Sequence, residues 1–281
     1  MHYLILYIIF MQLFSQTLRY SQRRGAGVLA VSAVNYVVAA AVSAVVLAGW
    51  WWSAGLSVQR VPLALGAVTG TLYFVNLLIM LAAYRLVGVG ITAAFSALGV
   101  VVPVIVSWYA WREQMTALRW AAVALLPVAV VLMRPSQNGR HRITFKADLI
   151  LVSAFLVPGV VGTLHKALNV YAPGAGRNLY QAALFAAAAL SSVAYARWRR
   201  ARYDRPVIVL GSVLGVSNVL ATLFVLLSLS VMQAVVFYPM SASLVIASSV
   251  VVSWLLWRER VTRRQVVGLL FAVCIVILAR L

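Results

Sequence analysis

Long apolar runs follow one another along the 281-residue chain and restrict its fold more than any other feature. A helix needs about 20 apolar residues to cross the hydrocarbon core of a bilayer. Hydrophobic residues make up 64% of the chain and charged residues only 10%, a balance that soluble domains do not have. The sequence therefore predicts an all-α integral membrane protein with about ten transmembrane helices. The runs are 2–18, 27–49, 61–83, 88–111, 116–134, 147–168, 177–196, 206–228, 231–257 and 262–280.

A seven-residue motif occurs twice, as SWYAWRE at 107–113 and as SWLLWRE at 253–259, so that Glu113 and Glu259 are 146 positions apart. Other similarities recur at almost the same spacing. They are TLRY at 17–20 with TLHK at 163–166, the GxxxG glycines Gly66 and Gly70 with Gly211 and Gly215, and Asn35 with Gln181. Collinear matches of this kind indicate an internal duplication.

The duplication predicts a first five-helix repeat at 1–134, a linker loop at 135–146 and a second five-helix repeat at 147–281. Because five is odd, the second repeat enters the membrane from the opposite side. Inverted repeats are typical of transporters, whose substrate site lies near the bilayer midplane between the halves.

Three segments resemble the drug/metabolite transporter superfamily, and within it the EamA-type ten-helix transporters. They are WRE at 111–113 after an apolar run, VFYP at 236–239, and WRERVTRRQVVG at 257–268. The resemblance extends over the whole chain. It implies a multi-pass protein of the plasma (inner) membrane that exports a small molecule by alternating access through a central cavity.

Lysine and arginine are distributed unequally between the predicted loops. The loops after the first, third, fifth, seventh and ninth helices hold 17 of these residues, and the other loops with the C-terminus hold 6. The positive-inside rule alone places both termini outside the cell. EamA-type proteins have both termini in the cytoplasm, so the orientation stays open.

The chain has only four acidic residues, and each of them falls at a helix end or in a loop. Proton antiport through a carboxylate inside the membrane is therefore not favoured, and exchange or the substrate's own gradient is the expected driving force. We expect Glu113 and Glu259 to lie at the positive ends of the helices that follow them. The arginines expected to pair with these two glutamates are Arg112, Arg119, Arg258 and Arg263.

His165 and Lys166 are the most interesting basic residues within the spans. They follow Pro158 in LVPGVVGTLHK, a segment able to break or bend its helix and so to expose backbone groups to a substrate. In that case Lys166 favours an anionic group. The alternative is that Lys166 lies at the helix end and extends its ammonium to the headgroups.

Polar side chains inside the predicted helices complete the candidate substrate site. These side chains are either cavity lining or hydrogen bonds between helices. The candidate substrate-binding residues are Gln16, Asn35, Tyr36, Tyr73, Asn76, His165, Lys166, Tyr180, Gln181, Asn218 and Tyr238, and the candidate hinges are Pro103, Pro158 and Pro239. The two GxxxG motifs are interpreted as packing surfaces.

Other function classes are not favoured by the sequence. The formal charge of +19 comes from arginines between apolar runs, which face lipid headgroups rather than nucleic acid. The single cysteine excludes a disulfide framework, and three separated histidines predict neither a metal site nor another cofactor. With no nucleophile motif, we do not expect an enzyme.

The expected partners are a small-molecule substrate and the lipid bilayer, and assembly, including a homodimer, stays open. The leading hypothesis is transport of a small polar or amphipathic metabolite, such as an amino acid or another anion-bearing solute. Two alternatives remain. One is a flippase or scramblase for a lipid-linked headgroup, and the other is a membrane scaffold that transports nothing.

Overall fold

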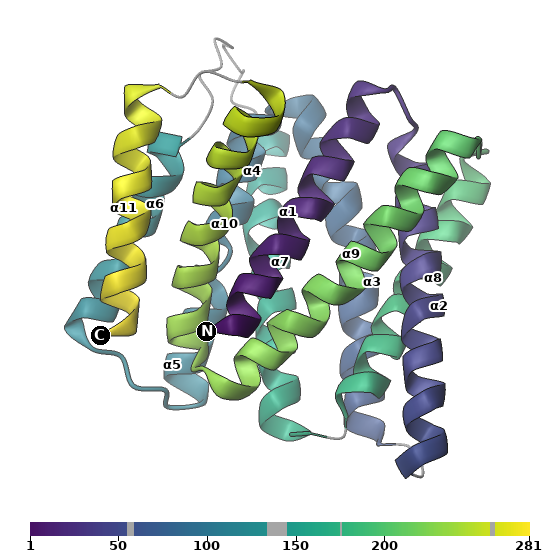
Figure 1. The fold of residues 1–281 in the computed structure, drawn as a ribbon, viewed down its shortest axis with the longest axis horizontal. Coiled ribbons are helices and arrows are strands. Elements are labelled where there is room, and N and C mark those ends of the chain that lie inside the picture. The colour runs from purple at the N-terminus through teal and green to yellow at the C-terminus, as the bar shows by residue number, and fades with distance from the viewer. Residues whose placement is uncertain (55–58, 134–144, 175, 259–261) are drawn as a thin grey trace. The chain divides into compact units, whose positions relative to one another are not determined.

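The computed structural model describes residues 1–54, 59–133, 145–174, 176–258 and 262–281. These residues form eleven α-helices, and the described part of the chain contains no strand. The helices are α1 (His2–Arg23), α2 (Val28–Ala54), α3 (Arg60–Leu86), α4 (Val89–Leu98), α5 (Val101–Ala110), α6 (Ala117–Met133), α7 (Phe145–Tyr171), α8 (Arg177–Trp198), α9 (Arg205–Val231), α10 (Ala234–Trp257) and α11 (Arg263–Arg280), labelled in Figure 1.

Seven helical segments are long and apolar enough to cross a membrane. They are Val28–Gly49, Arg60–Leu86, Ile91–Ala110, Phe145–Tyr171, Arg177–Trp198, Arg205–Val231 and Ala234–Trp257. Helix α6 is apolar over Ala117–Leu132 but shorter, and α1 and α11 lie outside this set. The prediction of an all-helical, multi-pass membrane protein is confirmed at this level. The predicted linker at 135–146 falls almost entirely outside the described residues.

The predicted run 88–111 is interrupted in the structure, because α4 ends at Leu98 and α5 begins at Val101. Pro103 has no N–H to donate to the Gly99 carbonyl, so the Val102 N–H donates to it instead, at 3.1 Å. This shorter bond is of the 3₁₀ type and tightens the chain locally. The interruption therefore follows from a candidate hinge residue, although the sequence pattern did not locate it.

Of the two possibilities, a break or a bend at Pro158, the structure excludes the break, because α7 runs without interruption from Phe145 to Tyr171. Close packing compensates for the hydrogen bond that the proline removes. A Cβ added to Gly159 would lie 2.6 Å from both the Gly99 carbonyl oxygen and the Val102 Cβ. The α4–α5 junction thus supports α7 immediately after its proline.

The chain divides into two compact units, and each takes helices from both sequence halves. Unit 1 consists of Met1–Phe74 and Ala167–Ser230, and unit 2 consists of Val75–Lys166 and Val231–Leu281. Helix α3 contributes its residues up to Phe74 to unit 1 and the remainder to unit 2.

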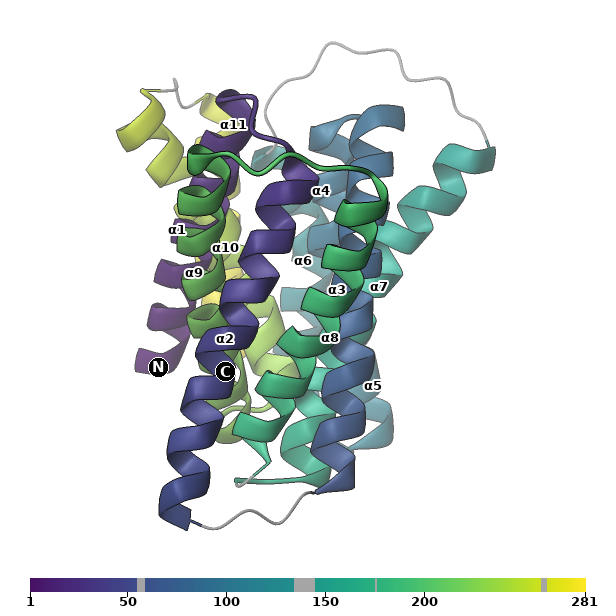
Figure 2. The same cartoon turned by 90° about the vertical axis from the view of Figure 1, so that its right-hand side faces the viewer.

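In unit 1, α2 packs along α8, and the two helices run in opposite directions (Figure 1). The segment that joins α8 to α9 crosses the end of unit 1 where α2 begins, as Figure 2 shows. Ala201 of this segment packs against the apolar cluster of Ala30, Val31, Val207 and Leu214. This contact fixes the α8–α9 segment on the start of α2.

Both GxxxG motifs are packing surfaces, as predicted. A Cβ added to Gly66 of α3 would lie 2.5 Å from the Tyr180 carbonyl oxygen of α8, and one added to Gly70 would collide with the Leu184 carbonyl oxygen. Gly211 and Gly215 of α9 approach α2 in the same way. A Cβ added to Gly211 would lie 2.5 Å from the Val34 Cβ, and one added to Gly215 would lie 2.7 Å from the Asn35 carbonyl oxygen and 2.8 Å from the Val38 Cβ.

In unit 2, α11 packs along both α6 and α10, and α10 also contacts α5 and α6. Figure 1 shows α6 and α11 side by side, running in opposite directions. The rings of Trp108 and Trp120 meet edge to face at 5.3 Å and join α5 to α6. Helices α5, α6, α10 and α11 thus form a packed group around the turn that contains Glu113.

Candidate functional site

Glu113 is the centre of a buried polar cluster in unit 2. Its Oε1 lies 2.6 Å from Lys166 Nζ of α7, and its Oε2 accepts the Val235 N–H at 3.0 Å. The two side chains are 7% and 12% exposed, respectively. A carboxylate in this position neutralises a buried ammonium and satisfies one of the unpaired N–H groups at the start of α10.

The local backbone explains why Glu113 points back toward the helices. Arg112 has a φ of +53°, so the chain reverses immediately after α5. The Glu113 N–H then donates to the Ser107 carbonyl at 3.2 Å. This turn holds the carboxyl group beside the end of α5 instead of sending it on toward α6.

The expected partners of Glu113 were wrong. Among the described residues, Glu113 forms an ion pair with Lys166 and not with an arginine. The backbone N–H that its carboxylate satisfies lies at the start of α10, not at the start of α6. Arg119 donates instead to the Gln114 carbonyl at 2.6 Å and to Gln233 Oε1 at 2.9 Å. Glu259, the repeated acid, lies outside the described residues.

Lys166 is not at a helix end, because α7 continues to Tyr171. The expectation that its ammonium extends from a helix end to the headgroups is therefore corrected. The neighbouring candidate His165 is buried, with 6% of its surface exposed.

A second contact of unit 2 joins α10 to α7. The Tyr238 hydroxyl donates to the Gly162 carbonyl, and a Cβ added to Gly162 would lie 3.1 Å from Pro103 and 3.2 Å from the Tyr238 ring. The candidate residues Tyr238 and Pro103 therefore meet at one glycine of α7. The other two candidate hinges, Pro158 and Pro239, lie inside unbroken helices.

In unit 1, six candidate residues form hydrogen bonds between helices. The Tyr36 hydroxyl donates to the Tyr73 carbonyl at 3.4 Å, and the Tyr73 hydroxyl lies 3.4 Å from Thr222 Oγ1. The remaining bonds are Tyr180 Oη to Thr69 Oγ1 at 3.0 Å, Gln181 Nε2 to the Val219 carbonyl at 2.8 Å, and Asn218 Nδ2 to Asn35 Oδ1 at 3.3 Å. These contacts satisfy buried polar groups and connect α2, α3, α8 and α9.

Two candidates behave differently. Gln16 Nε2 lies 3.5 Å from Gln12 Oε1 on the same helix, so this contact connects no helices. The Asn76 Oδ1 of α3 in unit 2 is buried and accepts no hydrogen bond from the described residues. A buried amide oxygen without a donor is an acceptor available to a ligand.

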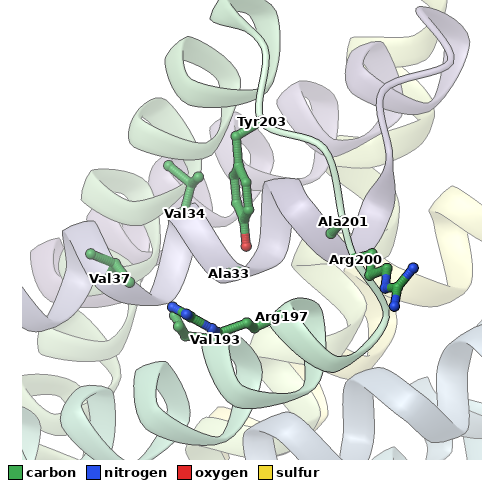
Figure 3. Close-up of a pocket in the computed structure, with 8 residues that line it drawn as sticks. All are labelled: Ala33, Val34, Val37, Val193, Arg197, Arg200, Ala201 and Tyr203. Carbon is green, nitrogen blue, oxygen red and sulfur yellow. The ribbon is translucent and has the colours of Figure 1, made fainter.

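A pocket of about 470 Å³ lies in unit 1, shown in Figure 3. Its lining contains none of the candidate substrate-binding residues. The lining residues are Ala33, Val34 and Val37 of α2, Val193 and Arg197 of α8, and Arg200, Ala201 and Tyr203 of the segment between α8 and α9. The sequence feature that could have indicated this pocket is the basic and aromatic run ARWRRARYDR. From the sequence alone, its arginines are interpreted only as loop residues that face lipid headgroups.

Comparisons with known proteins place the fold but not the function. No family model matches the chain, and no curated protein matches it. A solved crystal structure, described only as that of a protein, is similar over 100% of this chain and 98% of its own, with a TM-score of 0.81 and 14% sequence identity. At that identity the similarity shows the fold alone.

Proposed function

We propose that the chain is a secondary transporter that moves a small polar or amphipathic metabolite, with export as its direction. Two inverted five-helix repeats expose a cavity alternately to the two sides of the membrane. The resemblance to EamA-type proteins supports this function, and so does the reciprocal packing of the helices described below.

The reciprocal packing carries the proposal. Within each unit, helices at equivalent repeat positions pack on each other: α2 on α8 in unit 1, and α6 on α11 in unit 2. The glycine contacts are reciprocal as well, because α3 approaches α8 at Tyr180 and Leu184 while α9 approaches α2 at Val34 and Val38. Val34 and Val38 are 146 positions before Tyr180 and Leu184. Contacts of this kind are expected when a twofold axis relates two copies.

The backbone of the repeated motif supports the same relation. Arg112 and Arg258, which are 146 positions apart, both have a φ of +53°. Within its own unit, each pair of equivalent helices runs in opposite directions, α2 with α8 and α6 with α11 (Figure 1), which is the arrangement that inverted repeats require.

The buried cluster at Glu113 supports an anion-bearing substrate. Lys166 and the start of α10 together attract negative charge, and the carboxylate of Glu113 lies against both. A substrate carboxylate carries the same charge and the same acceptor atoms as Glu113. In this proposal it competes with Glu113 for Lys166.

Ligand-induced thermal stabilisation of the purified protein in detergent tests the function. The panel contains anionic, zwitterionic, cationic and lipid-linked compounds, and a compound that stabilises is then tested for counterflow in proteoliposomes. A ligand present at 100 times its dissociation constant adds about 2.7 kcal/mol to the folded state, which shifts the midpoint clearly.

The double variant Lys166→Met/Glu113→Gln is the matched control, because it removes both charges together. We expect a small anion or zwitterion to stabilise the unaltered protein, to undergo counterflow, and to lose its effect in the double variant. Stabilisation only by lipid-linked compounds, with no counterflow of any small solute, would favour the flippase or scramblase and overturn the transporter.

A further inference from the structure

The pocket of unit 1 has two chemically different walls. One wall is apolar and consists of Val34 and Val37 of α2 with Val193 of α8, and the other carries Arg197, Arg200 and Tyr203. Figure 3 shows the Tyr203 hydroxyl directed toward the space beside α2, and the Arg197 guanidinium extending toward Val37 and Val193. Cationic groups beside an apolar surface fit a ligand that is itself amphipathic and anionic.

The basic wall is fixed by the backbone. Arg200 has a φ of +51°, its N–H donates to the Arg197 carbonyl at 3.0 Å, and the Ala201 N–H donates to the Ala196 carbonyl at 2.9 Å. Ala201 also packs on the apolar cluster at the start of α2. The turn therefore fixes the backbone from which Arg197 and Arg200 extend, although Figure 3 shows the Arg200 guanidinium directed away from that of Arg197.

The charge around the pocket is almost entirely positive. Arginine occupies five of the nine positions from 197 to 205, and Asp204 is the single acid among them. The Oδ1 of Asp204 accepts the Val207 N–H at 3.0 Å and so caps the start of α9. Basic segments of this density attract anionic lipids at a membrane surface.

Exposed aromatic side chains surround the pocket. Trp198 is 73% exposed and Tyr203 is 48% exposed. The Arg199 guanidinium lies 5.9 Å from the centre of the Trp198 ring. Tryptophan and tyrosine collect where the hydrocarbon core meets the headgroups, so these side chains favour a position of the pocket at headgroup depth.

We propose that this pocket binds one anionic phospholipid. Arg197 holds the headgroup phosphate, and the Tyr203 hydroxyl donates a hydrogen bond to it. Arg200 swings its guanidinium to the same phosphate when the lipid binds, and the first part of an acyl chain lies on Val34, Val37 and Val193. The volume of about 470 Å³ is sufficient for a headgroup. This site shares no residue with the proposed substrate cluster at Glu113, and the proposal does not depend on transport.

Retention of lipid by the 281-residue protein tests the proposal. Protein in detergent is titrated with phosphatidylglycerol or phosphatidylcholine, and bound lipid is counted by native mass spectrometry. We expect one phosphatidylglycerol to be retained preferentially. Arg197→Gln/Arg200→Gln should bind it about 25-fold more weakly, at about fivefold per arginine.

The matched control is Arg263→Gln/Arg264→Gln, which removes the same charge from two exposed residues at the start of α11. It should retain phosphatidylglycerol as the unaltered protein does. An equal loss in both double variants would show general attraction to a basic surface and overturn the site.

Competition with soluble phosphates shows whether the pocket binds a lipid or a free anion. Glycerol 3-phosphate and inorganic phosphate lack acyl chains, so at the same concentration they should not displace phosphatidylglycerol or raise the thermal midpoint. Val193→Gln should weaken the lipid because it makes the apolar wall polar. Displacement by a soluble phosphate, or an undiminished affinity in Val193→Gln, would overturn the lipid assignment.

Discussion

Lys166 Nζ and Glu113 Oε1 lie 2.6 Å apart and form a buried ion pair between α7 and the turn that follows α5. Because the second carboxylate oxygen accepts the Val235 N–H, the same side chain also holds the start of α10. One carboxylate therefore connects three segments that come from both halves of the sequence.

Removal of one partner should destabilise the protein strongly. Lys166→Met leaves a buried carboxylate without its cation, and Glu113→Gln leaves a buried ammonium without its anion. Each single change should cost about 3 kcal/mol, a loss that is typical when one member of a buried pair is removed. The measurement is the unfolding free energy in detergent, followed by denaturant or heat.

The double variant Lys166→Met/Glu113→Gln should be clearly more stable than the sum of the single losses predicts, because neither charge is left alone. Asp148→Asn, at an exposed position in the first turn of α7, serves as the control and should change stability little. Strictly additive losses in the double variant would contradict an ion pair between these two residues.

Alanine at the reciprocal glycines should separate the helices that they bring together. Gly70→Ala adds a methyl group against the Leu184 carbonyl oxygen, and Gly215→Ala adds one 2.7 Å from the Asn35 carbonyl oxygen. Each substitution should cost about 1–3 kcal/mol because the backbone must move. Gly27→Ala is the control, since its added Cβ meets nothing within 4 Å. A loss of stability in only one of the two variants would contradict equivalent packing of the repeats.

Gln181, whose amide donates to a backbone carbonyl, and Asn76, whose buried Oδ1 has no donor among the described residues, should respond to substitution in opposite ways. Gln181→Leu removes a donor from the Val219 carbonyl and should lower stability by about 0.6 kcal/mol, the average for such bonds in membranes. Asn76→Leu removes an oxygen that accepts no hydrogen bond from the described residues, so stability should stay equal or rise.

Stabilisation by substrate then distinguishes a residue that binds the substrate from one that only supports the fold. If Asn76 contributes to the substrate site, Asn76→Leu loses the stabilisation by substrate although it folds well. Gln181→Leu should keep that stabilisation. A substrate effect that survives in Asn76→Leu would remove Asn76 from the proposed site.

Loss of the Tyr238 hydroxyl should loosen α10 from α7. Tyr238→Phe keeps the ring beside Gly162 and leaves the Gly162 carbonyl without this donor. Because the phenol and the carbonyl are both buried, the expected cost is about 1 kcal/mol. Hydrogen exchange near Gly162 should rise in the same variant, whereas Tyr109→Phe, at a residue that is 69% exposed, should leave it unchanged.

The positions of the helices could be read from the sequence by itself. Helix ends such as Val28, Ala117 and Arg263 lie within a few residues of the predicted ends. The physical reason is local, because a segment inside lipid must satisfy its own backbone hydrogen bonds and therefore forms a helix wherever an apolar run is long enough. The interruption at Gly99 was not predicted, because a proline inside an apolar run, such as Pro103, is compatible with either a kinked continuous helix or a broken one.

The side-chain partners were decided only by the tertiary structure. Nothing in the neighbourhood of Glu113 indicates Lys166 or the start of α10, and the nearby arginines were the natural expectation from sequence distance. The pocket at Arg197 likewise exists only because the turn at Arg200 lies on α2. Local sequence determines which segments become helices, whereas the close approaches at Gly70, Gly159 and Gly215 determine which helices meet, and therefore which buried charges and amides become partners.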